Sequence, residues 1–128
     1  MNFFSPSPGT GEPTLKNKPQ EMHMNSRSWK DNNPVLDREG VTGTKIYTQT
    51  EGEIVHMRLT PGAHLKSHIT PVNVAFYVLE GAATLTIGDE EETFPKDTII
   101  DSPKDIPHAV TNKGDSDLRL LVIKMPKP

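Results

Sequence analysis

Cysteine is absent from the 128-residue sequence, and aromatic residues make up only 5% of it. Without cysteine, the chain has no disulfide framework, no thiolate nucleophile and no zinc site built from cysteine. No run of about 18 apolar residues occurs, so the sequence predicts no membrane-spanning helix. The first residues lack the basic and apolar segments of a secretion signal. From these absences we expect a cytoplasmic protein with no membrane partner.

Neither sign of charge dominates the sequence. It contains 14 lysine and arginine residues and 17 aspartate and glutamate residues, which gives a net charge of −3. The two signs are interspersed, so no segment forms the basic surface that a nucleic-acid-binding protein needs. We therefore expect no nucleic-acid partner.

Proline and glycine are frequent, with 12 and 9 residues, while hydrophobic residues reach only 33%. Prolines recur before residue 35, in a polar segment that cannot bury enough surface to offset its ordering entropy. We interpret residues 1–34 as an extended or partly disordered arm and residues 35–128 as one β-barrel domain. Trp29 differs from its polar surroundings, and we expect its ring to dock onto the barrel or onto a partner subunit.

From Thr44 onward, apolar residues recur at every second position. Val55, Met57 and Leu59 lie on one face of a predicted strand. His56 lies on the opposite face, where we expect a surface or interface role rather than metal ligation. Turn signals separate the predicted strands at residues 51–52, 61–62, 81, 88–89 and 95–97. Because no helical period of useful length and no internal repeat occurs, the sequence predicts an all-β sandwich or barrel.

The segment from Pro61 to Gly81 resembles the first sequence motif of the cupin family, G-x5-H-x-H-x3,4-E-x6-G. Gly62, His68 and Gly81 stand at the expected spacing. Thr70 occupies the place of the second histidine, and Val74 occupies the place of the glutamate.

A later segment resembles the second motif of the same family, G-x5-P-x-G-x2-H-x3-N. Pro103, His108 and Asn112 match it, while Asp97 and Asp105 occupy the two glycine positions. The resemblance covers residues 45–125 and implies a double-stranded β-helix, the jelly-roll barrel of the cupins.

The motif spacing makes His68 and His108 the best site candidates. They bind a metal together, hydrogen-bond an organic ligand or water in the lumen, or have a purely structural role. A typical metal-binding cupin presents three histidines and one glutamate, whereas this sequence offers two of the four ligands. His68 and His108 are the candidate ligands for Mn, Fe, Ni or Zn, and His64 is a weaker replacement ligand in the preceding loop. The predicted pocket is lined by Met57, His68, Thr70, Val74, Phe76, His108 and Val110.

Two functions follow from this set of residues. The first is the binding of a small molecule in the barrel lumen, with no dependence on a metal. The alternative is a metal-dependent oxygenase, isomerase or hydrolase that uses His68 and His108. No residue pattern identifies a catalytic nucleophile. We also expect a homodimer, because exposed edge strands and an aromatic-bearing arm offer surfaces for a second subunit.

Overall fold

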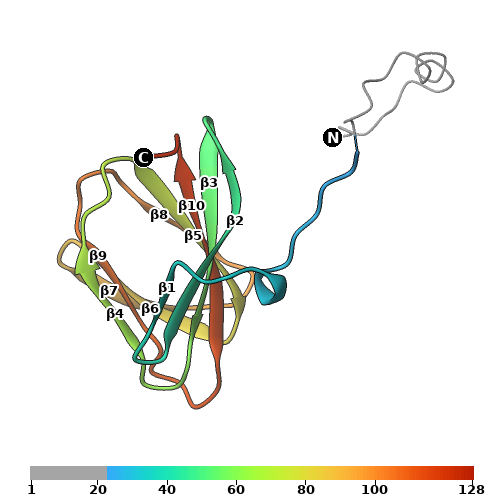
Figure 1. Cartoon of the computed structure of the whole chain (residues 1–128). Coiled ribbons are helices and arrows are strands. Elements are labelled where there is room, and N and C mark those ends of the chain that lie inside the picture. The colour runs from blue at the N-terminus through green and yellow to red at the C-terminus, as the bar shows by residue number, and fades with distance from the viewer. Residues whose placement is uncertain (1–22) are drawn as a thin grey trace, which may run out of the picture.

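The computed structural model describes residues 23–128, which form two β-sheets that face each other and a short 3-10 turn (Figure 1). The elements are η2 (Trp29–Asp31), β1 (Leu36–Arg38), β2 (Val41–Gln49), β3 (Gly52–Leu59), β4 (His64–His68), β5 (Asn73–Glu80), β6 (Ala82–Ile87), β7 (Glu90–Pro95), β8 (Ile99–Ser102), β9 (His108–Thr111) and β10 (Leu118–Met125). No helix in residues 23–128 is long and apolar enough to cross a membrane.

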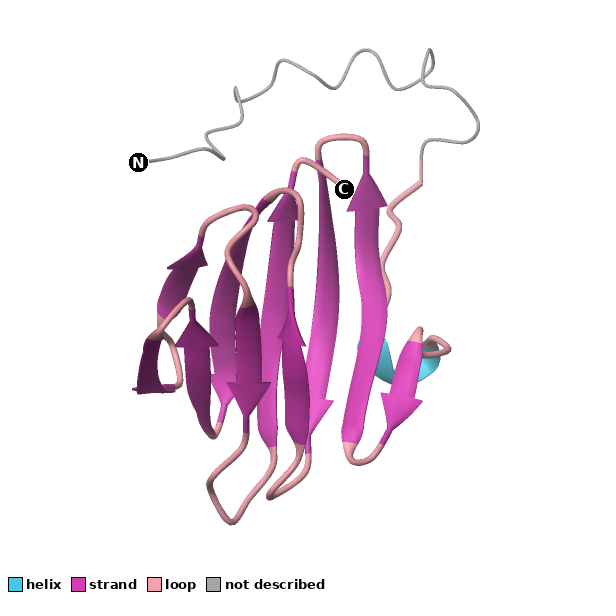
Figure 2. Ribbon diagram, turned by 90° about the vertical axis from the view of Figure 1, so that its left-hand side faces the viewer, coloured by secondary structure: helices cyan, strands magenta, loops and turns pink. Residues whose placement is uncertain are grey.

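The larger sheet has the strand order β1-β2-β3-β10-β5-β8, and the smaller one has the order β4-β9-β6-β7. All pairings are antiparallel, and Figure 2 shows the strands of the two sheets curving around a common interior. The predicted all-β double-stranded β-helix is confirmed. The strand β1 was not predicted, because Leu36–Arg38 is too short to show a periodic pattern.

The core fills the space between the sheets, and each strand contributes its alternate residues to it. The predicted inward face of β3 is confirmed, because Val55, Met57 and Leu59 are all buried in the core. Phe76 and Val78 of β5 pack against the same cluster. Alternate residues of β10 do the same from the centre of the large sheet, with the opposite faces of the strands directed outward.

The two aspartates at the glycine positions of the second motif adopt the backbone conformation that glycine favours. Asp97 and Asp105 both have a φ of 64°. Aspartate tolerates this left-handed region better than most residues, because its short side chain can hydrogen-bond locally. The turns that lead into β8 and β9 are therefore formed without glycine.

The carboxyl-terminal end of the predicted arm packs against the outer face of the large sheet. The Trp29 ring stacks on the His56 ring with centroids 4.4 Å apart and an interplanar angle of 8°. Trp29 thus docks onto its own barrel. His56 points outward from the barrel core, and the Trp29 ring that covers it leaves it only 2% exposed. Residues 1–22 of the arm lie outside the described part.

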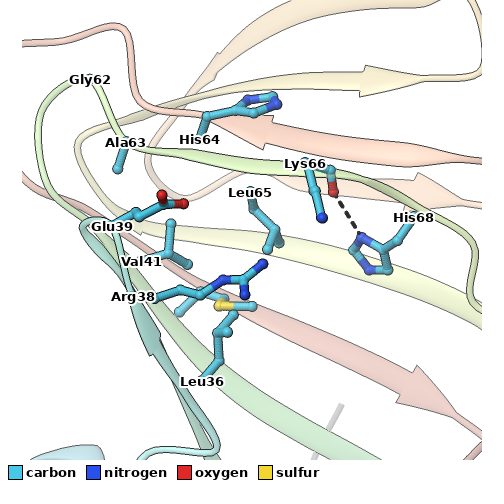
Figure 3. Close-up of a pocket in the computed structure, with 11 residues that line it drawn as sticks. Leu36, Arg38, Glu39, Val41, Gly62, Ala63, His64, Leu65, Lys66 and His68 are labelled. Atoms are coloured by element: carbon cyan, nitrogen blue, oxygen red, sulfur yellow. Dashed lines mark hydrogen bonds between the residues drawn. The ribbon is translucent and has the colours of Figure 1, made fainter.

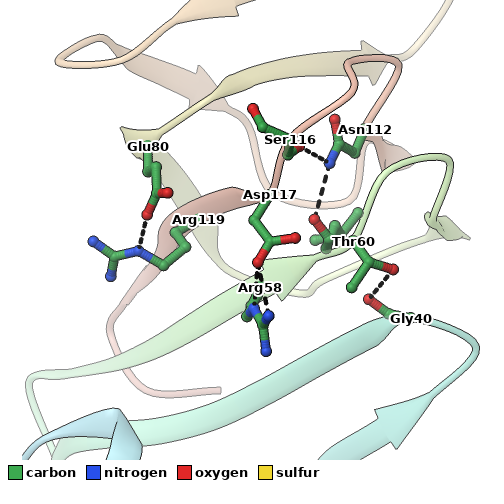
Figure 4. Close-up of polar contacts among 9 residues, drawn as sticks. Gly40, Arg58, Thr60, Glu80, Asn112, Ser116, Asp117 and Arg119 are labelled. Carbon is green, nitrogen blue, oxygen red and sulfur yellow. Dashed lines mark hydrogen bonds and ion pairs between the residues drawn. The ribbon is translucent and has the colours of Figure 1, made fainter.

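Polar contacts close the end of the barrel near the β9–β10 loop (Figure 4). The Asn112 side chain donates hydrogen bonds to the carbonyls of Leu59 and Ser116, at 2.9 and 2.8 Å, and accepts one from the amide of Gly114. The Arg58 guanidinium donates two hydrogen bonds to one carboxylate oxygen of Asp117. Asn112, the asparagine of the second motif, therefore has a structural role in this chain.

Candidate functional site

The two motif histidines meet inside the barrel, on neighbouring strands of the small sheet. His68 ends β4, His108 begins β9, and the two residues are register partners. Their Nε2 atoms are 3.2 Å apart, and the rings cross edge to face with centroids 4.5 Å apart. His108 is 2% exposed and its ring stands edge-on to Phe76, whereas His68 is exposed at the mouth.

Hydrogen bonds on both sides of the histidine pair determine where the protons lie when both rings are neutral. The Lys66 carbonyl, 3.2 Å from His68 Nδ1, can only accept, so His68 carries its proton on Nδ1. His68 Nε2 then accepts from His108 Nε2–H, which leaves His108 Nδ1 to accept from the Ser102 hydroxyl at 2.7 Å. The four groups form one hydrogen-bonded chain from Ser102 to the barrel mouth.

Thr70, which occupies the place of the missing histidine, contacts this series of hydrogen-bonded groups at His108. Its hydroxyl lies 3.3 Å from His108 Nε2 and is buried with it. Burial, followed by the charges of His68 and Lys124, lowers the pKa of His108 to about 4 from an ordinary value of 6.5. His108 is therefore a neutral imidazole at pH 7.

Val74, at the place of the missing glutamate, is part of a cross-strand row on the inner face of the large sheet. In this row Glu53 pairs with Lys124, Lys124 pairs with Val74, and Val74 pairs with Ser102. Ser102 connects the row to the histidine pair through His108. The two sheets thus bring their polar groups together at the same level of the barrel, and Val74 contributes only an apolar side chain to this row.

A cluster of two lysines and one glutamate lies at one end of this row, and its residues were not among the predicted site residues. Lys45 Nζ is 3.4 Å from one carboxylate oxygen of Glu53, and Lys124 Nζ is 3.5 Å from the other. Glu53 is 5% exposed and sits between the two ammonium groups. Each of the three continues an inward-facing stripe of its strand at a spacing of two, so strand alternation places them inward without singling them out as a cluster.

Two adjoining cavities open beside these residues. The inner cavity, of about 250 Å³, is lined by Val35, Leu36, Gly43, Lys45, Glu53, Val55, Met57, Leu65, His68, Phe76, Val122 and Lys124. The outer cavity, of about 590 Å³, lies between the edge strands β1 and β4 and is lined in part by Arg38, Val41 and Lys66 (Figure 3). Leu36, Met57, Leu65 and His68 line both cavities.

The predicted pocket residues divide into two groups. Met57, His68 and Phe76 line the inner cavity, while Thr70 and His108 adjoin it through the hydrogen bonds of His68 and His108. Val74 and Val110 are buried core residues, at 4% and 0% exposure, and neither is among the residues that line the two cavities.

The third predicted histidine is kept apart from the pair by a bulge in β4. The register shifts between Leu65 and His68, so both of these residues face inward opposite β9. His64, one residue before Leu65, points away from Leu65 and His68 (Figure 3). Its Nδ1 lies 2.7 Å from the Thr111 hydroxyl, and it lines the outer cavity. The structure therefore does not bring His64 to the pair.

The donor set can be compared with what a catalytic metal requires. The 3.2 Å separation of the two Nε2 atoms equals that of two ligands of one ion with metal–nitrogen bonds of about 2.1 Å. A third strong donor is missing, because Thr70 offers a neutral hydroxyl and no group of three His, Cys, Asp or Glu side chains converges within residues 23–128. The positive charge of Lys124, which disfavours a positive charge at His108, would also repel a metal ion bound there. These residues do not fit a three-ligand catalytic metal.

The cupin domain family model matches residues 55–124, which is more than half of the chain. The chain belongs to the cupin family. Within this cupin the match covers β5, β9, all but the last residue of β10, and both histidines of the pair. The cupin is also 28% identical to auxin-binding protein 1 of Arabidopsis thaliana over 131 aligned residues. That match covers 93% of this chain but only 62% of the plant protein.

Solved structures share the fold of this cupin at low sequence identity. The protein TT1209 of Thermus thermophilus is 24% identical with a TM-score of 0.71, and the match covers 82% of this chain and all of that one. KdgF of Halomonas sp. is 13% identical with a TM-score of 0.73, over 83% and 96% of the two chains. The polyketide cyclase RemF of Streptomyces resistomycificus is 20% identical with a TM-score of 0.70, over 82% and 81%.

Proposed function

We propose that this cupin is a binding protein that holds a small molecule in the lumen of its barrel. The inner cavity is the observation that carries the proposal. Apolar side chains such as Val55, Phe76 and Val122 form most of its wall, and polar groups are confined to one end. Binding sites for small molecules combine an apolar wall with a few polar groups that fix the orientation of the ligand.

The relatives support a ligand-binding role without identifying the ligand. Auxin-binding protein 1 is named for binding a small molecule, and this chain spans about 62% of its length. RemF is named as a polyketide cyclase and shares the fold with this chain. Both comparisons are consistent with a cupin barrel that accepts an organic molecule, and neither fixes its chemistry here.

A variant that fills the inner cavity tests the proposal. A Cβ at Gly43 would lie 3.1 Å from Met57 Sδ, the flexible end of a side chain that also lines the cavity. The leucine side chain of Gly43→Leu should therefore fill the inner cavity and leave the strand β2 intact. Thr42→Leu adds the same side chain to the opposite face of β2 and is the matched control.

The neutral probe phenylacetamide can be titrated while the backbone amide signals are followed by NMR. Signals of residues that line the inner cavity should shift in wild type and in Thr42→Leu, and should stay unchanged in Gly43→Leu. Shifts that survive Gly43→Leu, or that lie elsewhere on the barrel, would contradict the lumen as the binding site. Thermal denaturation checks that both variants remain folded.

The metal-dependent alternative has one observation in its favour, the 3.2 Å separation of the histidine nitrogens. Elemental analysis of protein purified without chelator tests it directly. Stoichiometric Mn, Fe, Ni or Zn that disappears in His108→Ala would favour this alternative, whereas substoichiometric metal that is unchanged in His108→Ala would end it. The homodimer, the cytoplasmic location and the absence of nucleic-acid and membrane partners stay predictions.

A further inference from the structure

The polar end of the inner cavity carries a charge that the protein itself does not neutralise. The ammonium groups of Lys45 and Lys124 flank the single carboxylate of Glu53, and all three residues line the cavity. His108 is a neutral imidazole at pH 7 because burial holds down its pKa. Two cations and one anion therefore leave one positive charge at this end of the lumen.

Both lysines retain capacity to bind an anion. Each ammonium group has three donor hydrogens, and the only carboxylate contact of each within residues 23–128 is that to Glu53. These contacts, at 3.4 and 3.5 Å, are longer than the roughly 2.7–2.9 Å of a strong charge-assisted hydrogen bond. Glu53 therefore contacts both ammonium groups without saturating the donors of either one.

The surroundings of the lysines favour an ion pair with a ligand over a purely solvated cation. The Lys124 side chain is 23% exposed and that of Lys45 is 42% exposed, while the Glu53 side chain is 7% exposed. Ion pairs that are partly withdrawn from water are screened less than those on an open surface. Lys124 pairs across the sheet with Val74, and Val74 pairs with Ser102. Because the Ser102 hydroxyl is hydrogen-bonded to His108, Lys124 lies at the same level of the barrel as the hydrogen-bonded groups of the lumen.

We propose that the ligand of this barrel is a small organic monocarboxylate, with its carboxylate held by Lys45 and Lys124 and its apolar body in the inner cavity. This proposal rests on the proposed binding function. A monoanion would neutralise the end of the cavity, whereas a phosphate dianion would leave a negative charge beside Glu53. The cavity of about 250 Å³ has the volume of about eight water molecules, which suits a ring or a short branched chain.

Three probes of similar size and different charge separate the ligand classes. Phenylacetate is the monocarboxylate, phenylacetamide is its neutral counterpart, and phenyl phosphate is the dianion at pH 7.5. Dissociation constants come from NMR titrations of the full chain at about 0.1 M salt. Wild-type protein should bind phenylacetate about tenfold more tightly than phenylacetamide, which corresponds to the contribution of one partly buried ion pair.

Substitutions of the charged cluster should change the binding of the anion in opposite directions. Lys124→Met should abolish the tenfold preference for phenylacetate and leave phenylacetamide binding unchanged. Glu53→Gln frees both ammonium groups and should tighten phenylacetate binding severalfold. Lys113→Met removes a lysine paired with Glu91 on the small sheet, and this matched control should have no effect.

The outcomes distinguish the failure of this proposal from the failure of the proposed function. If phenylacetamide binds in the lumen and phenylacetate binds no more tightly, the barrel binds small molecules and the monocarboxylate assignment is wrong. Tighter binding of phenyl phosphate than of phenylacetate would also overturn the assignment. If neither phenylacetate nor phenylacetamide shifts the signals of the cavity residues, the proposed function itself fails. The opposite effects of Lys124→Met and Glu53→Gln cannot both arise from a general loss of folding.

Discussion

Removing the Trp29 side chain should change the response of this cupin to acid through His56. His56 lies on the outer face of the large sheet, beneath the stacked Trp29 ring, and Arg119 Nη1 donates a hydrogen bond to its Nε2 at 3.0 Å. Burial, followed by the charges of Arg119 and Arg58, lowers the pKa of His56 to about 4. A proton on Nε2 would point at a guanidinium group, so the folded protein keeps this ring neutral.

The pKa difference translates into a loss of stability in a defined pH range. Between pH 6.5 and 4 the unfolded chain binds a proton at His56 and the folded chain does not, so the free energy of unfolding falls as the pH falls. From pH 7 to pH 5, a histidine with these two pKa values lowers the free energy of unfolding by about 2 kcal/mol. In Trp29→Ala the ring of His56 becomes hydrated, and its pKa should rise to a value between 4 and 6.5.

Two measurements check this prediction. An NMR pH titration of the histidine ring protons gives the His56 pKa in wild type and Trp29→Ala, and the absence of one signal in His56→Gln assigns it. Urea denaturation at pH 7 and pH 5 gives the free energies of unfolding. Trp29→Ala should cost about 1 kcal/mol at pH 7, because the aromatic stack is lost, and this difference should shrink at pH 5. Trp29→Phe keeps an aromatic cover and should behave more like wild type.

Two results would refute this reasoning. One is a His56 pKa near 6.5 in the wild-type protein, which would mean that Trp29 does not cover the ring in solution. The other is a difference in stability between wild type and Trp29→Ala that stays constant or grows from pH 7 to pH 5. His64→Gln, which removes an exposed histidine from the small sheet, is the matched control.

Three further predictions concern the barrel and its arm. Gly81→Ala should lower the free energy of unfolding by more than about 2 kcal/mol in urea denaturation, because φ is +78° and the new Cβ would lie 2.5 Å from the Asp117 carbonyl oxygen. Gly62→Ala, at φ +85° in open space, should cost only about 1 kcal/mol, and equal losses would contradict this explanation. Asn112→Ala should cost about 3 kcal/mol in the same assay, because it leaves the buried Leu59 carbonyl and the part-buried Ser116 carbonyl without their donor; a loss under about 1 kcal/mol would argue against the structural role. Deleting the residues before Trp29 should weaken the predicted homodimer. A dimer mass that is unchanged in light scattering would exclude this part of the arm as the segment that joins the two subunits.

Part of the candidate site could be predicted from the sequence, namely the residues that are identified by the spacing within a motif or along one strand. His68 and His108 were found by motif spacing, and the structure brings their Nε2 atoms within 3.2 Å of each other. Lys45, Glu53 and Lys124 were open to prediction from strand alternation, but charged residues rarely occupy inward positions, so the pattern alone does not single them out. Which of these residues meet was not predictable, because neighbours across a barrel come from strands far apart in the chain.

The sequence by itself determined most of the strands, the face to which most side chains point and the turns between the strands. These are local properties, set by the period-two alternation of a strand and by the backbone preferences of glycine, proline and aspartate. Only the tertiary structure decided that Trp29 covers His56, that a bulge separates His64 from His68, and that two lysines share Glu53 at the lumen. Each of these depends on strand register or on packing between distant segments, which alternation along one strand does not encode.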